Sequence, residues 1–241
     1  MERKEAIRGA YRMTGGNSFY DGMITCSTLS GKAVCRLVWA MNKVENDAYL
    51  EKAMSGIPEH FSGKLLEVPV GTGILTMPVY QTMPEADITC LDYSPDMMRQ
   101  AREKADRLHL KNVTFRQGDV GALSYADDTF DIVLSLNGFH AFPDKEAAYR
   151  EVFRVLRPGG TFLICNESNG DTDKDENWTK IIGGMTIYKD AELKTYLEQA
   201  GFHDVQIHDV QIHKNEKGWL CILVQKQQYD AEGIKYSERD T

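Results

Sequence analysis

Two glycines and two acids stand where apolar stretches of this chain end. Gly71 and Gly73 follow the first stretch, and because neither has a Cβ they let the backbone approach a ligand closely. Asp92 comes about 20 residues later, the spacing at which an acid hydrogen-bonds the hydroxyls of a ribose. Asp119, in the turn after the third stretch, could accept a hydrogen bond from an adenine amino group. These residue types and spacings predict a site for a nucleoside-containing ligand.

Strand-like apolar stretches and helix-like amphipathic stretches alternate from residue 64 onward. We expect strands at 64–70, 87–92, 112–117, 130–136 and 161–165, and helices at 95–108, 144–156 and 191–200. The segments 202–213 and 219–226 have no helix between them, so they should form an antiparallel pair. The 130–136 segment is apolar enough to be central in a parallel sheet.

Two of the helix boundaries carry sequence signals. Ser94 is a favourable N-cap, Pro95 suits the first helical position, and an acid follows in the first turn. The run Pro158-Gly159-Gly160 follows the helix expected at 144–156 and is predicted to end it before the fifth strand begins.

The alternation predicts an α/β fold with an open, doubly wound, mostly parallel sheet between two layers of helices. Ligands of such sheets bind beyond the carboxyl ends of the strands, at the point where the strand order reverses. Gly71, Asp92, Asp119 and the segment 137–140 each follow a different strand, so we expect them on one edge. Each residue alone also fits a turn, a cap or a loop. Their joint placement favours a binding site.

Composition excludes several classes of function. The net charge of −8 and the isoelectric point near 5.3 argue against a nucleic-acid groove, which needs clustered Lys and Arg. The five cysteines are scattered and form no C-x-x-C pair, as expected of reduced thiols in the cytoplasm. The first residues lack the apolar core of a signal peptide, and no run reaches membrane-spanning length. The histidines show no metal-ligand spacing with carboxylates.

The ordered motifs resemble the class I S-adenosylmethionine-dependent methyltransferases, and among them the small-molecule branch that contains the ubiquinone and menaquinone biosynthesis enzymes. The resemblance covers residues 60–226 and is carried by Glu67-Val-Pro-Val-Gly71-Thr-Gly73, Leu91-Asp92-Tyr93-Ser94, Gly118-Asp119, Phe130-Asp131-Ile132-Val133 and Leu156-Arg157-Pro158-Gly159-Gly160. It implies a seven-stranded Rossmann-like sheet whose last strand is antiparallel. It also implies S-adenosylmethionine as cofactor and methyl transfer to a small acceptor.

The resemblance also implies roles for individual residues. Glu67, Gly71 and Gly73 would cradle the methionine part of the cofactor, with Asn137 near the same end. Asp92 would take the ribose. The full predicted cofactor set is Tyr20, Glu67, Val68, Gly71, Gly73, Asp92, Tyr93, Met97, Gly118, Asp119, Val120 and Asn137.

Pro69 departs from the family pattern, which has glycine at this position. Proline fixes φ and removes an N–H, so the chain must enter the turn differently here. This departure bears most directly on the contacts expected of Glu67 and Val68.

Three parts are expected along the chain: a helical appendage at 1–63, the cofactor-binding domain at 64–226 and a polar tail at 227–241. An open cofactor site needs a cover that keeps water from the sulfonium. Tyr11 and Tyr20 stand among glycines in the appendage, and in related methyltransferases an N-terminal tyrosine contacts the cofactor. A lid of such residues, or of the 166–188 loop, predicts an apolar pocket for a small aromatic or lipophilic acceptor.

Two alternatives to a methyltransferase remain open from the sequence. A nicotinamide-dependent oxidoreductase would have a third glycine where Thr76 stands, and no downstream Tyr-x-x-x-Lys accompanies it. A protein that binds the cofactor without turnover is the second.

The 136–139 segment bears on the methyl acceptor. It lacks the Pro-Pro-aromatic motif of enzymes that methylate the amino groups of nucleic-acid bases, and it lacks a Pro-Cys nucleophile. His140 is the best candidate for a general base, or else a loop histidine packed under the cofactor.

Overall fold

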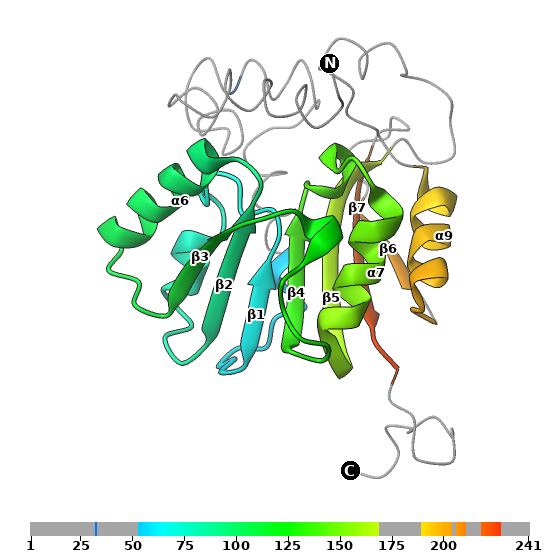
Figure 1. Cartoon of the computed structure of the whole chain (residues 1–241), viewed down its shortest axis with the longest axis horizontal. Helices are drawn as coiled ribbons and strands as arrows, with labels where there is room; N and C mark the ends of the chain where they lie inside the picture. Colours follow the sequence, from blue (N-terminus) through cyan, green and yellow to red (C-terminus); the bar gives the residue numbers. More distant parts are fainter. Residues whose placement is uncertain (1–31, 33–52, 169–188, 204–205, 211–217, 228–241) are drawn as a thin grey trace.

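The computed structural model describes residue 32 and residues 53–168, 189–203, 206–210 and 218–227. Its strands form one seven-stranded sheet in the order β3-β2-β1-β4-β5-β7-β6 (Figure 1). The strands are β1 (Lys64–Glu67), β2 (Asp87–Asp92), β3 (Val113–Gln117), β4 (Phe130–Leu136), β5 (Leu156–Ser168), β6 (Gln206–Val210) and β7 (Gly218–Gln225). The helices are α5 (Met77–Tyr80), α6 (Pro95–Arg107), α7 (Lys145–Val155) and α9 (Asp190–Ala200), with 3-10 turns η1 (Val120–Ala122) and η2 (Phe139–Ala141).

The sheet is parallel from β3 to β5 and antiparallel beyond β5. Strand β1 pairs in parallel with β2 on one side and with β4 on the other. Strand β7 runs antiparallel to both of its neighbours, β5 and β6. The strand order therefore reverses between β1 and β4, where α/β sheets bind their ligands. The doubly wound fold and the antiparallel last strand are confirmed.

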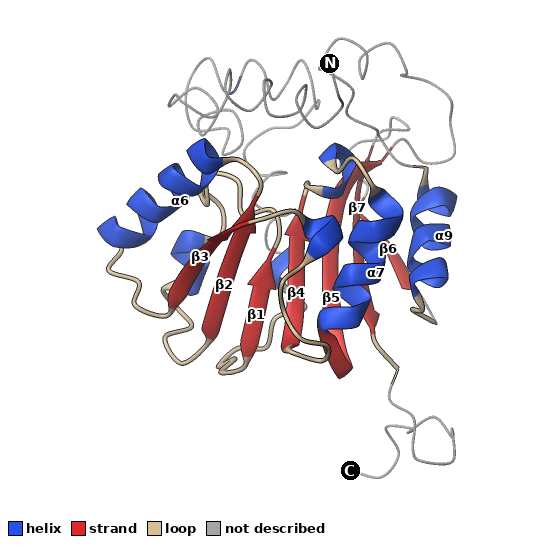
Figure 2. Ribbon diagram, in the orientation of Figure 1, coloured by secondary structure: helices blue, strands red, loops and turns tan. Residues whose placement is uncertain are grey.

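Both faces of the sheet are buried, which explains why the central strands are continuous apolar runs. Along β1, Leu65 packs with residues of α5 and α6, whereas Leu66 packs with residues of α7 and α9. This alternation follows from the pleat, since successive side chains of a strand point to opposite faces. Helices α7 and α9 lie side by side (Figure 2), and Tyr149 stacks on Tyr196 between them with ring centroids 5.6 Å apart.

Helix α6 begins as its sequence predicts. The Ser94 hydroxyl accepts a hydrogen bond from the backbone N–H of Met97 at 3.4 Å, and Pro95 occupies the first helical position. A cap of this kind contributes about 1 kcal/mol. The face that carries Met98, Ala101 and Ala105 is buried against the sheet, so the cap fixes the start of a helix that the core already favours.

The end of α7 agrees with the predicted helix 144–156, but the start of β5 was predicted wrongly, at residue 161. Helix α7 ends at Val155, and β5 begins at Leu156 and runs through Pro158, Gly159 and Gly160. Gly159 N–H donates to the carbonyl of Lys226, whose own N–H donates to the carbonyl of Gly160, so the glycines belong to the ladder with β7. The pairing of β4 with β5 also shifts register here. The Pro-Gly-Gly run is thus an irregular strand start rather than a helix stop.

Several predictions fall outside the described residues. Most of the appendage at 1–63, the 169–188 segment and the tail from 228 onward belong to this group, and the lid remains a prediction. In the described part of the chain, no helix is long and apolar enough to cross a bilayer.

Candidate functional site

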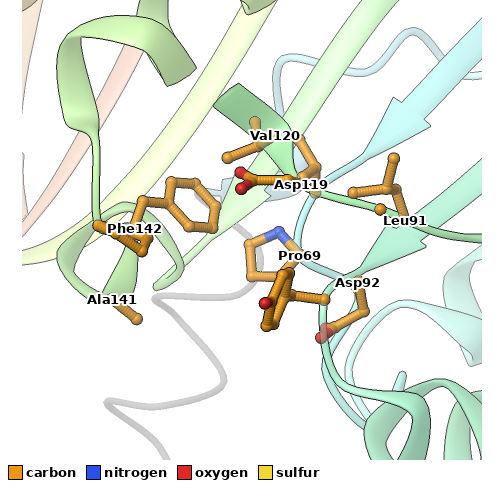
Figure 3. Close-up of a pocket in the computed structure, with 11 residues that line it drawn as sticks. Pro69, Leu91, Asp92, Asp119, Val120, Ala141 and Phe142 are labelled. Carbon is orange, nitrogen blue, oxygen red and sulfur yellow. The ribbon is translucent and has the colours of Figure 1, made fainter. Parts of the chain in front are cut away.

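A pocket opens at the carboxyl ends of β1, β2 and β3, beside η2 (Figure 3). It contains about 480 Å³ of empty space, part of which is open to solvent. Its lining residues are Val68, Pro69, Leu91, Asp92, Tyr93, Gly118, Asp119, Val120, Ala141, Phe142 and Pro143. In Figure 3, Asp119 and Phe142 point toward the same space from opposite sides, next to Pro69. The switch point therefore carries a concave site with two acids and a mostly apolar wall.

Asp92 is the buried acid of this pocket and organises two turns. One carboxylate oxygen accepts the backbone N–H of Gly71 and the other accepts that of Ser94, both at 2.8 Å. Only 4% of the residue is exposed, and this burial raises the pKa of Asp92 to about 6, although the two N–H groups act in the opposite direction. Each oxygen keeps further lone-pair capacity for a ligand hydroxyl.

The two glycines of the β1 turn have different reasons to be glycine. Both have positive φ, +57° at Gly71 and +67° at Gly73. A Cβ on Gly73 would lie 2.9 Å from Cγ of Met77, so Gly73 is required by packing. A Cβ on Gly71 would meet nothing within 4 Å. Gly71 therefore presents bare backbone to open space beside Asp92, as a cradle for a ligand would.

Glu67 is buried at the end of β1 but does not line the pocket. The Tyr80 hydroxyl donates to its carboxylate at 2.8 Å, and the Cys90 thiol lies 3.6 Å from the same oxygen. Burial raises the pKa of Glu67 to about 8, and the bond from Tyr80 offsets this only in part. At neutral pH this side chain is mainly protonated, and it is hydrogen-bonded to Tyr80.

The third strand end supplies Gly118, Asp119 and Val120. Gly118 N–H donates to the carbonyl of Asp92 at 3.0 Å, which ties this turn to the end of β2. One Asp119 oxygen accepts the N–H of Gly121 at 2.9 Å and caps η1. The side chain of Val120 is buried. An acid and an apolar side chain are thus held together at the pocket wall.

The ring of Pro69 packs directly against Gly138. The Val68–Pro69 peptide bond is cis. Hydrogen bonds flank it on both sides, from Val68 N–H to Leu134 and from Val70 N–H to Leu91, each 2.9 Å long. The proline ring occupies the space that a Cβ on Gly138 would need. The chain therefore accommodates the proline through a glycine on the neighbouring strand end.

Of the remaining predicted residues, Asn137 and Met97 are not among those that line this pocket. Asn137 follows β4 with φ of +51°, and its N–H donates to the carbonyl of Cys165 on β5. Met97 is buried in the first turn of α6. His140 lies in η2, although its side chain, like all of Tyr20, is outside what the structure describes. Among the described residues, no group of three or more His, Cys, Asp or Glu side chains could hold a metal ion.

Sequence reasoning missed the pocket wall formed by Leu91, Ala141, Phe142 and Pro143. Leu91 directly precedes Asp92, so its place at the strand end was a usable signal. The other three are the last residue of η2 and the two residues that follow it, and only the path of the chain after β4 returns them to the pocket. Nothing in their spacing indicates that return.

Comparisons with known proteins agree with this geometry. Residues 60–220 match a family described as "Methyltransferase domain". An arsenite methyltransferase of Halobacterium salinarum is 32% identical over 52% of this chain and 33% of its own length. A demethylmenaquinone methyltransferase of Thermus thermophilus is 37% identical over 42% of this chain and 46% of its own length. The chain thus spans less than half the length of these two relatives.

A solved structure extends the match to the fold. A SAM-dependent methyltransferase from Aquifex aeolicus superposes with a TM-score of 0.60 at 22% identity and covers 73% of this chain and 89% of its own. At that identity the likeness shows a shared fold. The family match covers well over half of the chain, including all three strand ends that line the pocket. The chain belongs to the methyltransferase-domain family.

Proposed function

We propose that this chain binds S-adenosylmethionine in the β1–β3 pocket and transfers its methyl group to a small-molecule acceptor. The observation that carries the proposal is the pair of Asp92 and Gly71. A buried carboxylate with lone pairs to spare lies beside backbone that no side chain covers. Family membership supports the same reading.

The residues present fit the parts of this cofactor. Asp92 would accept the ribose hydroxyls, because a buried acid gains most from charge-assisted hydrogen bonds. Asp119 would accept the adenine amino group, with Val120 and Phe142 against the faces of the ring. The open backbone at Gly71 would take the methionine part. Glu67, bonded to Tyr80 beneath the turn, would support this part from below.

The protein's contribution to the reaction is alignment and exclusion of water. When bound, S-adenosylmethionine supplies an activated methyl group, which a lone pair of the acceptor attacks while the carbon–sulfur electron pair leaves with S-adenosylhomocysteine. The turn at Gly71 and the wall at Phe142 would fix the direction of approach. His140 remains the candidate base for an acceptor that must lose a proton, and a pH–rate limb near about 6.5 that disappears in His140→Ala would support that role.

The acceptor class and the location of the chain are part of the same proposal. Relatives named for arsenite and demethylmenaquinone both support a small molecule rather than a nucleic acid. We favour an aromatic or lipophilic acceptor under a lid formed by residues 1–63, with Tyr20 over the cofactor. A cytoplasmic location is supported by the thiols of Cys90 and Cys221, which form no disulfide.

Calorimetric titration with S-adenosylhomocysteine tests the cofactor site. We expect one site per chain, and Asp92→Ala should weaken binding by about 2 kcal/mol, or roughly thirtyfold. Asp87→Ala, at the opposite end of the same strand, should leave the affinity unchanged. Unchanged affinity in Asp92→Ala would rule out the ribose assignment, and tight binding of NADH instead would favour the oxidoreductase.

Turnover and the lid need separate measurements. Formation of S-adenosylhomocysteine with arsenite or a demethylmenaquinone analogue would separate an enzyme from a protein that only binds the cofactor. Hydrogen exchange on residues 1–63 should slow when S-adenosylhomocysteine is added, because a cover gains protection on binding. Equal exchange with and without the ligand would mean that the appendage is scaffold.

A further inference from the structure

A group of buried polar atoms at the carboxyl ends of β4 and β5 has no hydrogen-bond partner. These atoms are Oγ of Ser135, Oδ1 of Asn137, and both Oδ1 and Nδ2 of Asn166. Ser135 is 0% exposed and Asn166 is 1% exposed. Native proteins pair nearly all buried polar groups, because an unpaired one costs stability. Four such atoms together require an explanation.

The register places these side chains close together. Ser135 is paired with Ile164, and Leu136 with Cys165. Asn137, directly after β4, and Asn166, on β5, come next, and the N–H of Asn137 donates to the carbonyl of Cys165. By the alternation of the strands, Ser135 and Asn166 lie on the face where Val133, Phe162 and Ile164 pack against α7. Asn137 is only partly buried, so a ligand would reach the group from its side. We call Ser135, Asn137 and Asn166 the β4–β5 polar group.

This polar group adjoins the cofactor pocket through Gly138. The position of a Cβ on Gly138 lies 3.2 Å from Oγ of Ser135 and overlaps the ring of Pro69. Pro69 in turn lines the cofactor pocket. Oγ of Ser135 and Pro69 therefore lie on either side of Gly138, which separates this unpaired atom from the pocket.

Among the described side chains, no buried charged group lies on the face of the sheet that carries Ser135 and Asn166. Among the described residues, the buried carboxylates are Glu67 and Asp92. Both alternate onto the opposite face of the sheet, with Leu65 on β1 and with Cys90 on β2. The buried side chains that pack on the α7 face are apolar, among them Phe139, Tyr149 and Leu193. A buried ionic ligand would lack a countercharge here.

We propose that Ser135, Asn137 and Asn166 bind an uncharged hydroxyl or carbonyl group of the methyl acceptor. An amide and a hydroxyl can each donate and accept, so together they can pair with a hydroxyl, which does both, or with a carbonyl, which only accepts. The inference rests on the proposed methyl-transfer function and extends it. It assigns the acceptor to neutral alcohols, phenols and ketones rather than to amines or acids.

A matched probe series tests the preference. The full chain is saturated with S-adenosylhomocysteine and titrated with 1-naphthol, 1-naphthoate and 1-naphthylmethylammonium, which share one ring and differ in charge. We expect 1-naphthol to bind at least about tenfold more tightly than either ion. Asn166→Leu and Ser135→Ala should remove that preference while the affinity for S-adenosylhomocysteine stays within about twofold. Equal binding of the three probes, or no binding, overturns the proposal.

Thermal stability gives a second, independent readout. A buried amide that has no hydrogen-bond partner until a ligand binds lowers the stability of the free protein. Asn166→Leu should therefore raise Tm by about 2–4 °C. Asn112→Leu is the matched control, because the Asn112 amide donates to the carbonyls of Met83 and Ala86 at 2.8 and 3.1 Å. That variant should lower Tm. If Asn166→Leu also lowers Tm, the amide serves the structure and the proposal fails. If the unaltered chain did not bind S-adenosylhomocysteine at all, that result would instead contradict the proposed function itself.

Discussion

The two halves of the ligand-binding edge treat their buried polar groups in opposite ways. At the ends of β1 and β2, both oxygens of Asp92 accept backbone N–H groups, and Glu67 is bonded to Tyr80. At the ends of β4 and β5, the side-chain atoms of Ser135 and Asn166 have no partner. The first half is held in shape before any ligand arrives. The second half retains hydrogen-bonding capacity that only a ligand or water can use.

The halves also differ in charge. Glu67 and Asp92 are buried acids whose pKa values are raised by burial, to about 8 and about 6. The β4–β5 polar group contains only amides and a hydroxyl. Stability and binding at the first half should therefore depend on pH, whereas substitutions in the second half should act equally at every pH. The contact of Pro69 with Gly138 joins the two halves.

The largest expected effect is the pH dependence of stability caused by Glu67. Between pH 6 and about 7 the native carboxyl keeps its proton and near pH 8 it is about half ionised, whereas an unfolded glutamate, with a pKa of 4.5, has lost its proton throughout this range. The unfolded state then binds fewer protons, so the free energy of unfolding falls as pH rises, by up to about 1.4 kcal/mol per unit. Urea denaturation at pH 6, 7 and 8 should show this slope, and Glu67→Gln should reduce it.

Two variants serve as controls for that slope. Asp87→Asn, an exposed acid at the start of β2, and Asn166→Leu in the second half should both retain the slope of the unaltered chain. If Glu67→Gln keeps the slope as well, the buried acid of the first half is not its origin.

The contact that joins the halves predicts a strong steric coupling. Gly138→Ala should lower the free energy of unfolding by about 2–3 kcal/mol, because the new Cβ overlaps the Pro69 ring. In a Pro69→Gly background the same substitution should cost at least about 1 kcal/mol less. A double-mutant cycle by urea denaturation measures this, and strictly additive effects would show that the two positions do not share space.

Cofactor affinity should also depend on pH through Asp92. Below its pKa of about 6 the carboxylate gains a proton and loses its charge-assisted bonds to the ribose. Affinity for S-adenosylhomocysteine should therefore fall by about tenfold from pH 7 to pH 5. Asp92→Asn should bind more weakly at pH 7 and show a flat profile. An unchanged pH dependence in this variant would assign the titration to another group.

The smallest effect concerns the two glycines of the β1 turn. Gly71→Ala should cost about 1 kcal/mol of stability, since its φ is positive but its surroundings are open. Gly73→Ala should cost more, because its Cβ would lie 2.9 Å from Cγ of Met77. Denaturation of both variants tests this order. Only Gly71→Ala should combine near-normal stability with weakened binding of S-adenosylhomocysteine; the reverse order would exchange the two roles.

Much of the fold could be predicted because its signals are local. The buried parallel strands are continuous apolar runs, and the cap at Ser94 marks the start of α6 within the residues that use it. The start of β5 could not be predicted in this way. Whether Pro158-Gly159-Gly160 stops a helix or starts a strand depends on Lys226, which lies far away in the sequence. The strand ladder decides that boundary.

The sequence by itself determined the order of the elements and the residues that follow each strand, and thereby brought Gly71, Asp92 and Asp119 to one edge. Only the tertiary structure decided which polar groups find partners there. Hydrogen bonds such as that from Gly71 to Asp92, the match of Pro69 to Gly138, and the unpaired Ser135 and Asn166 all depend on contacts between strands. Residue type limits what a side chain can bond. Its neighbours across the sheet determine whether that capacity is used, and they are set only when the chain is folded.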